Sequence, residues 1–278
     1  MSDVVRNYYN EGVTKEWERL AKPYRRLELV STLQLIDEFF PPGGHVADIG
    51  GGPGRYTIAL LQRGYEVSLF DLSACAVDFA KEHLEKLNLR ANRVETADAR
   101  NLTILPSETF DAALELGPMY HIVEKEDRLK ALSELHRILK PGAPAIVGYV
   151  NPWGLLRSGL TEFPNLYANE PLIRQLFGTF VQTGEQSAFT EAVFISPTQA
   201  TEELRSCGFA VECRAGVEGC ASGALEQVTA LAESDPAGYE VLAHLVAESS
   251  THPAFRDCTE HLHVVVRKIA QLRTTLSP

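Results

Sequence analysis

The sequence lacks the long apolar segments that membrane proteins and secreted precursors carry. No uninterrupted apolar stretch in its 278 residues reaches about 18 residues, the length that a membrane-spanning helix needs. Residues 1–10 contain Asp3 and no apolar core of about 7 to 15 residues, so they do not match a signal peptide. We therefore expect no membrane association and a cytoplasmic location.

Cysteine is scarce as well. The chain has five cysteines, an odd number, and no C-x-x-C pair. The five are Cys75, Cys207, Cys213, Cys220 and Cys258. Because structural metal sites and redox sites need closely spaced ligands, we predict reduced thiols and no metal site.

Positive charge is in deficit. The chain has 26 Lys and Arg against 37 Asp and Glu, which gives a formal net charge of −11. An acidic protein repels phosphate backbones and anionic lipids unless it carries a local basic patch, and the pairs Arg25-Arg26 and Arg267-Lys268 are too short to form one. The composition therefore disfavours nucleic acid and membrane surfaces as partners.

Short β-branched runs alternate with longer helical patterns along most of the chain. This alternation predicts an α/β protein with a doubly wound, mostly parallel sheet. Strands are expected at residues 45–49, 66–70, 92–96, 110–116, 144–150, 209–214 and 262–267. Helices are expected at residues 56–62, 74–87, 125–139, 198–207, 225–233 and 239–247, with Ser73 as the cap of the second.

A glycine-rich turn follows the first predicted strand. It reads Asp48-Ile49-Gly50-Gly51-Gly52-Pro53-Gly54-Arg55. Such a turn between a strand and a helix brings backbone N–H groups close to a ligand. The nicotinamide fingerprint places glycines at offsets of about 0, 2 and 5, and here the third position falls on Arg55. The turn therefore favours a different nucleotide-like ligand.

Acidic residues stand at or near the ends of four predicted strands. Asp48, Asp71 and Asp98 are joined by Glu115 near the end of the fourth strand. In an open parallel sheet, ligands bind outside the carboxyl ends of the strands, so we expect all four to face one crevice. Asp71 follows the glycine turn at a distance suited to a carboxylate that binds ribose hydroxyls.

These segments together resemble the class I S-adenosylmethionine-dependent methyltransferases, in their small-molecule branch. The motifs are DIGGGPGRY at 48–56, FDLS at 70–73, ADAR at 97–100, FDAALELGPMYH at 110–121 and LKPGAPAIV at 139–147. The resemblance implies a Rossmann-like seven-stranded sheet of order 3-2-1-4-5-7-6 with strand 7 antiparallel. It implies S-adenosyl-L-methionine as the cofactor.

The resemblance also implies contacts to the methionine half of that cofactor. Gly50, Gly52 and Gly54 would pass along it. Asp48 would hold the turn, or the cofactor amine through water, and the Leu116 carbonyl would reach the ammonium group.

The nucleoside half would meet the next two strand ends. Asp71 would bind the ribose and Leu72 would pack on the adenine face. Asp98 would accept from the adenine amine, while the Ala99 N–H would meet a ring nitrogen.

His121 is the candidate base. It follows the fourth strand, where an imidazole could take a proton from an attacking hydroxyl, amine or thiol. The other interpretation is a structural histidine that braces the loop, and Tyr120 beside it is expected in the pocket wall. Methyl transfer needs little acid–base help, because in-line placement supplies much of the acceleration.

The rest of the chain is expected to form one domain with this core. Residues 1–40 would be an N-terminal helical cap, from which Arg25 could meet the cofactor carboxylate, as could Arg55. Residues 41–152 would be the cofactor-binding core, 153–196 a lid and 197–278 the completion of the sheet. The lid would either enclose the acceptor or form a satellite core. Its aromatic residues are Trp153, Phe163, Tyr167, Phe177, Phe180, Phe189 and Phe194.

The expected function is methyl transfer to an O, N or S atom of a small, apolar or aromatic molecule by direct displacement. Two alternatives remain open at this point. One is an NAD-type oxidoreductase on the same fold, and the other is a non-catalytic S-adenosylmethionine-binding regulatory protein. The sequence leaves the oligomeric state undetermined.

Overall fold

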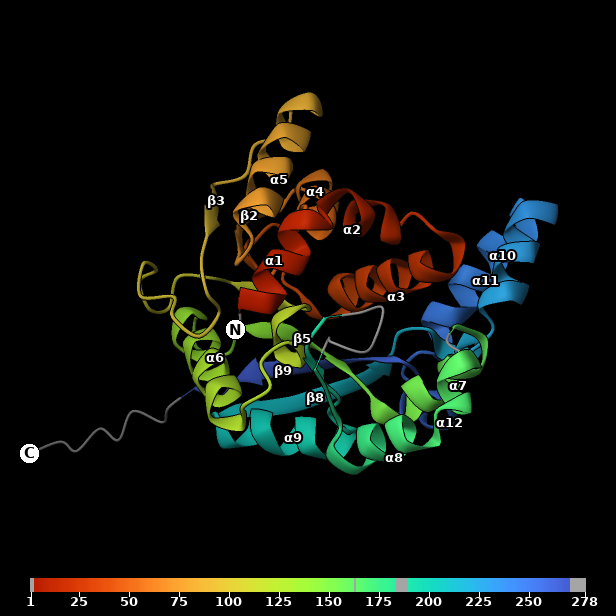
Figure 1. Cartoon of the computed structure of the whole chain (residues 1–278). Coiled ribbons are helices and arrows are strands. Elements are labelled where there is room, and N and C mark those ends of the chain that lie inside the picture. Colours follow the sequence, from red (N-terminus) through yellow and green to blue (C-terminus); the bar gives the residue numbers. More distant parts are fainter. Residues whose placement is uncertain (1–2, 163, 184–189, 271–278) are drawn as a thin grey trace, which may run out of the picture.

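Seven strands form one sheet with helices on both faces (Figure 1). The computed structural model describes residues 3–162, 164–183 and 190–270. The strands of the sheet are β1 (His45–Ile49), β2 (Glu66–Asp71), β3 (Arg93–Thr96), β4 (Ala112–Glu115), β5 (Pro144–Val150), β8 (Phe209–Gly216) and β9 (His261–Lys268).

The strand order is β3-β2-β1-β4-β5-β9-β8. Strands β1 to β5 pair in parallel, whereas β9 is antiparallel to both β5 and β8. This topology confirms the predicted order 3-2-1-4-5-7-6 with an antiparallel seventh strand. The parallel half brings the ends of β1, β2 and β4 to one edge of the sheet.

Apolar layers bury both faces of the sheet. The covering helices are α3 (Pro23–Phe39), α4 (Arg55–Gln62), α5 (Ala74–Lys86), α6 (Lys125–Ile138) and α9 (Pro197–Ser206). Val46 and Ile146 pack with residues of α3 and α4, whereas Ala47 and Val147 pack with residues of α6 and α9. Since successive side chains of a strand point to opposite faces, each strand contributes to both layers.

Local signals start and end helices as predicted. The Ser73 hydroxyl accepts the Ala76 N–H at 3.1 Å and caps α5. Helix α6 ends before Pro141 and Gly142, and Gly142 takes a φ of +77° that favours glycine. The boundaries move by a few residues: the predicted strand 110–116 shortens to β4, and the predicted helix 239–247 lengthens to α11 (Pro236–Ser249).

The N-terminal region consists of α1 (Asp3–Glu11), α2 (Val13–Arg19) and α3. The helical region is interrupted at Gly12, before α2, and again before Pro23, the first residue of α3. Near the N-terminal end of α3, Tyr24 and Leu27 pack with Val228 and Val246. Those partners come from α10 (Leu225–Ser234) and α11, which lie beside α3 in Figure 1, with η3 (Gly219–Ala221) and α12 (Pro253–Arg256) next to them along the chain.

The segment between β5 and α9 forms a small unit of its own. It comprises α7 (Pro152–Glu162), η2 (Pro164–Ala168), α8 (Glu170–Thr179), β6 (Val181–Gln182) and β7 (Ala192–Val193). Phe177 and Phe180 pack with Leu176 and Phe194 in a satellite core. Phe163 and Phe189 lie outside the described residues.

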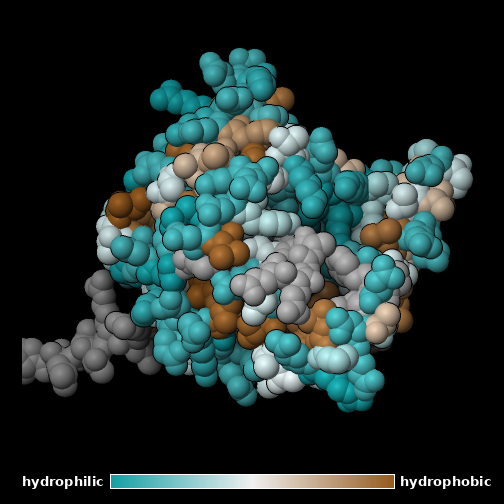
Figure 2. Space-filling view, in the orientation of Figure 1, coloured by the Kyte–Doolittle hydropathy of each residue, from teal (hydrophilic) through white to brown (hydrophobic). Residues whose placement is uncertain are grey.

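The surface view shows mostly hydrophilic side chains, with apolar ones gathered over the region of α7 and α8 (Figure 2). Trp153 and Leu160 on α7 are 52% and 63% exposed. Over the described ranges, we find no helix long and apolar enough to cross a membrane.

Candidate functional site

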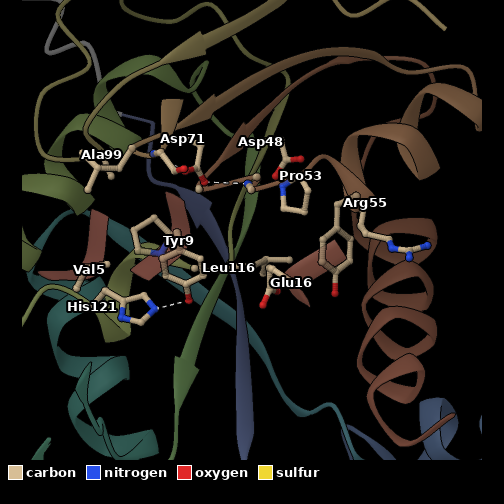
Figure 3. A pocket seen from close by; sticks show the side chains of 18 of the residues that line it. Val5, Tyr9, Glu16, Asp48, Pro53, Arg55, Asp71, Ala99, Leu116 and His121 are labelled. Carbon is tan, nitrogen blue, oxygen red and sulfur yellow. Dashed lines mark hydrogen bonds between the residues drawn. The ribbon is translucent and has the colours of Figure 1, made fainter. Parts of the chain in front are cut away.

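A pocket lies at the carboxyl ends of β1, β2 and β4 (Figure 3). It encloses about 930 Å³ of empty space, counting its opening to solvent. Helices α1 and α2 contribute its outer wall, and the short helix η1 (Pro118–Tyr120) contributes another side. The topology therefore places a cavity where the strand-end residues were expected to meet.

The glycine turn forms one wall of this pocket. Gly50 has a φ of +70°, and a Cβ there would lie 2.5 Å from the Pro118 ring. Gly52 has a φ of +53°, a Cβ there would meet no atom within 4 Å, and its N–H donates to the Asp71 carboxylate at 2.8 Å. Gly54 takes a φ of +87° as the N-cap of α4 but does not line the pocket. The turn thus exposes backbone and little side chain to a ligand.

A buried carboxylate, Asp48, and a half-buried one, Asp71, stand beside the turn. Asp71 accepts N–H groups from Gly52 and Ser73, both at 2.8 Å, and burial raises its pKa against the effect of these bonds. Asp48 accepts the Thr57 hydroxyl at 2.6 Å, and burial raises its pKa to about 6. A carboxylate oxygen has two lone pairs, so Asp71 can accept ligand hydroxyls as well.

The structure places the other predicted cofactor residues in two groups. Leu72, Ala99 and Leu116 line the pocket. Asp98 and Arg25 do not. Their roles toward a cofactor stay predictions.

Ion pairs hold both side chains that lie outside the pocket lining. The Asp98 carboxylate binds Arg100 at 2.7 Å, and Arg100 also pairs with Asp127. Arg25, in the first turn of α3, pairs with Glu162 and Glu260. Arg100 follows Asp98 by only two residues, but its second partner, Asp127, belongs to another element. The partners of Arg25 do as well, and sequence spacing carries no information on such pairs.

Glu115 also differs from expectation. It is fully buried and does not line the pocket. Neither of its oxygens has a hydrogen-bond partner within the described part of the chain, and burial raises its pKa to about 8. The expectation that it faces the crevice is wrong because β4 turns it toward the face that carries Ala113, within the apolar layer.

The opposite wall of the pocket carries three aromatic rings. His121 and Tyr120 were predicted at the site, and Tyr9 reaches it from α1 (Figure 3). The Tyr9 hydroxyl lies 2.7 Å from Nε2 of His121, whose Nδ1 lies 2.9 Å from the Glu191 carbonyl oxygen. Burial lowers the pKa of His121 to about 4, so the ring is neutral near pH 7.

Side-chain contacts hold the cap across the pocket. The Arg55 guanidinium donates to the Trp17 carbonyl at 2.6 Å and stacks 3.8 Å above the Trp17 ring. The Ser73 hydroxyl donates to Asn10 at 2.7 Å. Since Arg55 and Ser73 come from the core, these contacts tie α1 and α2 to the strand ends.

Charged residues in the pocket wall were missed by the sequence reasoning. Arg19 of α2 bridges Glu16 and Glu28, each at 2.7 Å, and all three line the pocket with Tyr56. Charged positions on an amphipathic helix normally face solvent, so the sequence pattern does not place these residues in a pocket.

Glu218, Glu260 and His261 form a cluster outside the pocket lining. The atoms with which they could bind a metal ion lie within 4.8 Å of one another. The His261 Nδ1 lies 2.5 Å from Glu218. Against the lowering effect of burial, Glu218 raises the pKa of His261 to about 9. An imidazolium paired with a carboxylate is no metal ligand, so this cluster is an ion pair network.

The pocket fits S-adenosylmethionine in the chemistry of its walls. The open space over Gly52 leaves room for backbone contacts to the amino-acid moiety, and Asp71 supplies acceptors for hydroxyls. Leu72 and Ala99 offer apolar surface for a purine. Tyr9, Tyr120 and His121 line the same pocket.

Comparison with protein families places a methyltransferase domain at residues 46–142. An O-methyltransferase from Pyrenophora dematioidea is 29% identical over 51% of this chain and 53% of its own length. A glycine/sarcosine N-methyltransferase from Aphanothece halophytica is 29% identical over 50% of this chain and 52% of its own. A tRNA 5-carboxymethoxyuridine methyltransferase from Escherichia coli is 30% identical over 54% of each. The chain thus spans about half the length of the curated relatives it matches.

Solved structures agree on the fold. A Methanosarcina mazei protein described as belonging to the SAM-dependent methyltransferases superposes with a TM-score of 0.59 at 16% identity. The match covers 85% of this chain and 98% of that one, so the shared architecture includes the sheet beyond residues 46–142.

Proposed function

From its membership of the class I S-adenosylmethionine-dependent methyltransferase superfamily, we propose that this chain transfers a methyl group from S-adenosylmethionine to a small molecule. The observation that carries the proposal is the pocket at the strand ends. It combines Asp71 and the glycine turn with a wall made by Tyr9, Tyr120 and His121. We assign the first side to the cofactor and the second to the acceptor.

In this proposal the core residues bind and orient the cofactor. Asp71, already fixed by two backbone N–H groups, binds the ribose hydroxyls. The turn at Gly50 and Gly52 passes along the methionine moiety, and the Leu116 carbonyl accepts its ammonium group. The bound cofactor supplies a methyl group on a positively charged sulfur. The chain's contribution is to hold the acceptor in line and to exclude water.

The acceptor is proposed to be a small molecule methylated on O, N or S. The α1–α2 wall over the pocket and the net charge of −11 support this choice. A tRNA acceptor is the competing candidate, because a relative of similar identity carries that activity in its name. Incubation with labelled cofactor and total tRNA tests it directly: label in the tRNA fraction would overturn the small-molecule proposal.

A titration with S-adenosylhomocysteine and with NAD tests the cofactor. We expect calorimetry to detect S-adenosylhomocysteine alone, because the third position of the nicotinamide fingerprint is Arg55, which is committed to Trp17. Binding of NAD alone would favour the oxidoreductase. Cofactor binding without transfer to any acceptor, small molecule or tRNA, would favour the regulatory protein.

We propose one domain for the chain, with residues 1–40 as cap, 41–152 as core, 153–196 as lid and 197–278 as the remainder. The contacts of α1 and α2 with the core and the pairing of β9 with β5 support this division. The described aromatic residues of the lid do not line the pocket, which favours a satellite core for that segment.

A further inference from the structure

The hydrogen bonds around His121 determine which way the protons point. A carbonyl oxygen can only accept, so Nδ1 of His121 donates its proton to Glu191. A neutral imidazole carries one ring proton, which leaves Nε2 as an acceptor. The Tyr9 hydroxyl, 2.7 Å away, must therefore donate to Nε2 (Figure 3).

This direction constrains what the Tyr9 oxygen can do in the pocket. Its only proton is committed to His121, so any other group that it binds must donate to it. The Tyr120 hydroxyl is one such donor, which leaves the Tyr9 oxygen one further lone pair for a ligand. Tyr9 and Tyr120 both line the pocket, and both rings contact the His121 ring, with centroids 5.3 and 4.5 Å away. A ligand group bound by the Tyr9 oxygen must itself be a hydrogen-bond donor.

We propose that Tyr9 is a catalytic residue that binds a hydroxyl group of the methyl acceptor, with His121 as its positioning residue and final proton acceptor. The inference rests on the proposed methyl transfer and deepens it by naming the accepting atom. The acceptor hydroxyl donates to the Tyr9 oxygen, which turns the lone pairs of the hydroxyl oxygen toward the cofactor side of the pocket.

The proton path is complete within these residues. The hydroxyl oxygen uses a lone pair to bond the methyl carbon, and the carbon–sulfur pair returns to sulfur, which gives a neutral thioether. The hydroxyl proton passes to the Tyr9 oxygen as the Tyr9 proton passes to Nε2. His121 ends as an imidazolium that still donates to Glu191, and it returns its proton to solvent after product release.

A weak base suffices for an oxygen acceptor but not for an amine. A protonated ether is a far stronger acid than an imidazolium, so a buried imidazole with a pKa of about 4 still takes its proton. An alkylammonium is a far weaker acid, and it would have to lose a proton before it could attack. The pair therefore meets the needs of a hydroxyl acceptor, whereas an alkylammonium acceptor would need a stronger base.

The test uses the full chain, matched acceptors and three variants. The acceptors form two matched pairs: phenol with aniline, and 2-phenylethanol with 2-phenylethylamine. Methyl transfer is measured by the release of S-adenosylhomocysteine. Tyr9→Phe removes the proton carrier, and His121→Gln keeps an acceptor for Tyr9 but no base. Tyr8→Phe, on the neighbouring position of α1 and outside the pocket lining, is the matched control.

We expect transfer to a hydroxyl member of the panel. Tyr9→Phe and His121→Gln should each lower kcat by about a hundredfold, with S-adenosylhomocysteine affinity within about twofold, since neither residue is assigned to the cofactor. Independently of turnover, ¹⁵N NMR should show His121 protonated on Nδ1 at pH 7, with an Nε2 shift that moves in Tyr9→Phe and stays in Tyr8→Phe.

Transfer to the amine members alone, or to no hydroxyl at all, would overturn the inference. Wild-type kcat in Tyr9→Phe or in His121→Gln would also overturn it, as would a proton on Nε2 of His121. If the wild-type protein did not bind S-adenosylhomocysteine, the proposed function itself would be wrong.

Discussion

The two sides of the pocket are built in different ways. On the strand-end side, backbone groups from adjacent turns fix the key side chains: Asp71 is bound by N–H groups 2 and 19 residues away. On the cap side, side chains meet across long separations, 38 residues for Arg55 and Trp17 and 112 for Tyr9 and His121. The first side follows from the topology of a parallel sheet, whereas the second depends on how α1 and α2 dock. We infer that the strand-end side determines cofactor binding and the cap side determines acceptor choice.

The largest expected effect falls on the strand-end side, at Gly50. Gly50→Ala forces a side chain into positive φ and into the Pro118 ring, and we expect a loss of about 3 kcal/mol in the free energy of unfolding. Gly52→Ala is the matched control, because its φ is also positive but no atom lies within 4 Å, so we expect a loss of about 1 kcal/mol. Urea unfolding of both variants measures the difference. Equal losses would show that Pro118 does not confine the turn.

Asp71→Ala is next in size and tests cofactor binding on the same side. Charge-assisted hydrogen bonds contribute about 1.5 to 3 kcal/mol each, so we expect the Kd for S-adenosylhomocysteine to rise by about ten- to a hundredfold. Asp78→Ala on the exposed face of α5 is the control and should leave the Kd unchanged. An unaltered Kd in Asp71→Ala would remove the ribose assignment.

Glu115 tests whether a residue near the end of a strand also belongs to the pocket. Its pKa of about 8 lies above the usual 4.5, so the folded state holds a proton that the unfolded state has lost between these pH values. The contribution of Glu115 to the free energy of unfolding is therefore fully present below about pH 4.5, and it is lost as pH rises from about 4.5 to about 8. Glu115→Met should flatten that slope and raise the free energy of unfolding at pH 8 by about 1 to 2 kcal/mol.

Urea unfolding across this pH range measures the slope, and calorimetry measures the Kd for S-adenosylhomocysteine. We expect that Kd to stay unchanged in Glu115→Met, because Glu115 does not line the pocket. A weaker cofactor complex would return Glu115 to the crevice where the sequence had placed it.

The smallest effect is expected on the cap side, at Arg55. Arg55→Ala removes the stacking on Trp17 and the hydrogen bonds to its carbonyl, which together should weaken S-adenosylhomocysteine binding by about fivefold. Limited proteolysis should cut between α1 and α2 sooner in this variant. Arg63→Ala, at an exposed position just beyond α4, is the control and should change neither measurement. Equal protection of the cap in both variants would mean that Arg55 does not hold it.

Much of the fold could be predicted from the sequence. β1 and β5 have the predicted bounds, and Ser73 caps α5 as expected. These features are local: a strand follows from a run of apolar residues and a cap from a single hydroxyl. The meeting of Asp48 and Asp71 was predictable for the same reason, because parallel strands bring their carboxyl ends to one edge.

Other parts of the site could not be predicted, because they depend on contacts that join different elements. Asp98 is bound by Arg100, which reaches Asp127 on α6, and Arg25 reaches Glu162 and Glu260. Pairing of this kind depends on the relative placement of helices. The same holds for Arg19 and Glu28 in the pocket wall, whereas Glu16 lies one turn before Arg19 on the same helix.

The sequence by itself determined the glycine turn and the identity of the residues at the strand ends, because each depends on short-range pattern. The strand order was predicted from the resemblance to a known family and not from that pattern. Only the tertiary structure decided that the Tyr9 proton points to His121 and that Glu115 faces the apolar core. The first needs the docking of α1 against a loop 112 residues away. The second needs the register of β4. Because side chains alternate between the two faces of a strand, a shift of one residue would turn Glu115 to the opposite face.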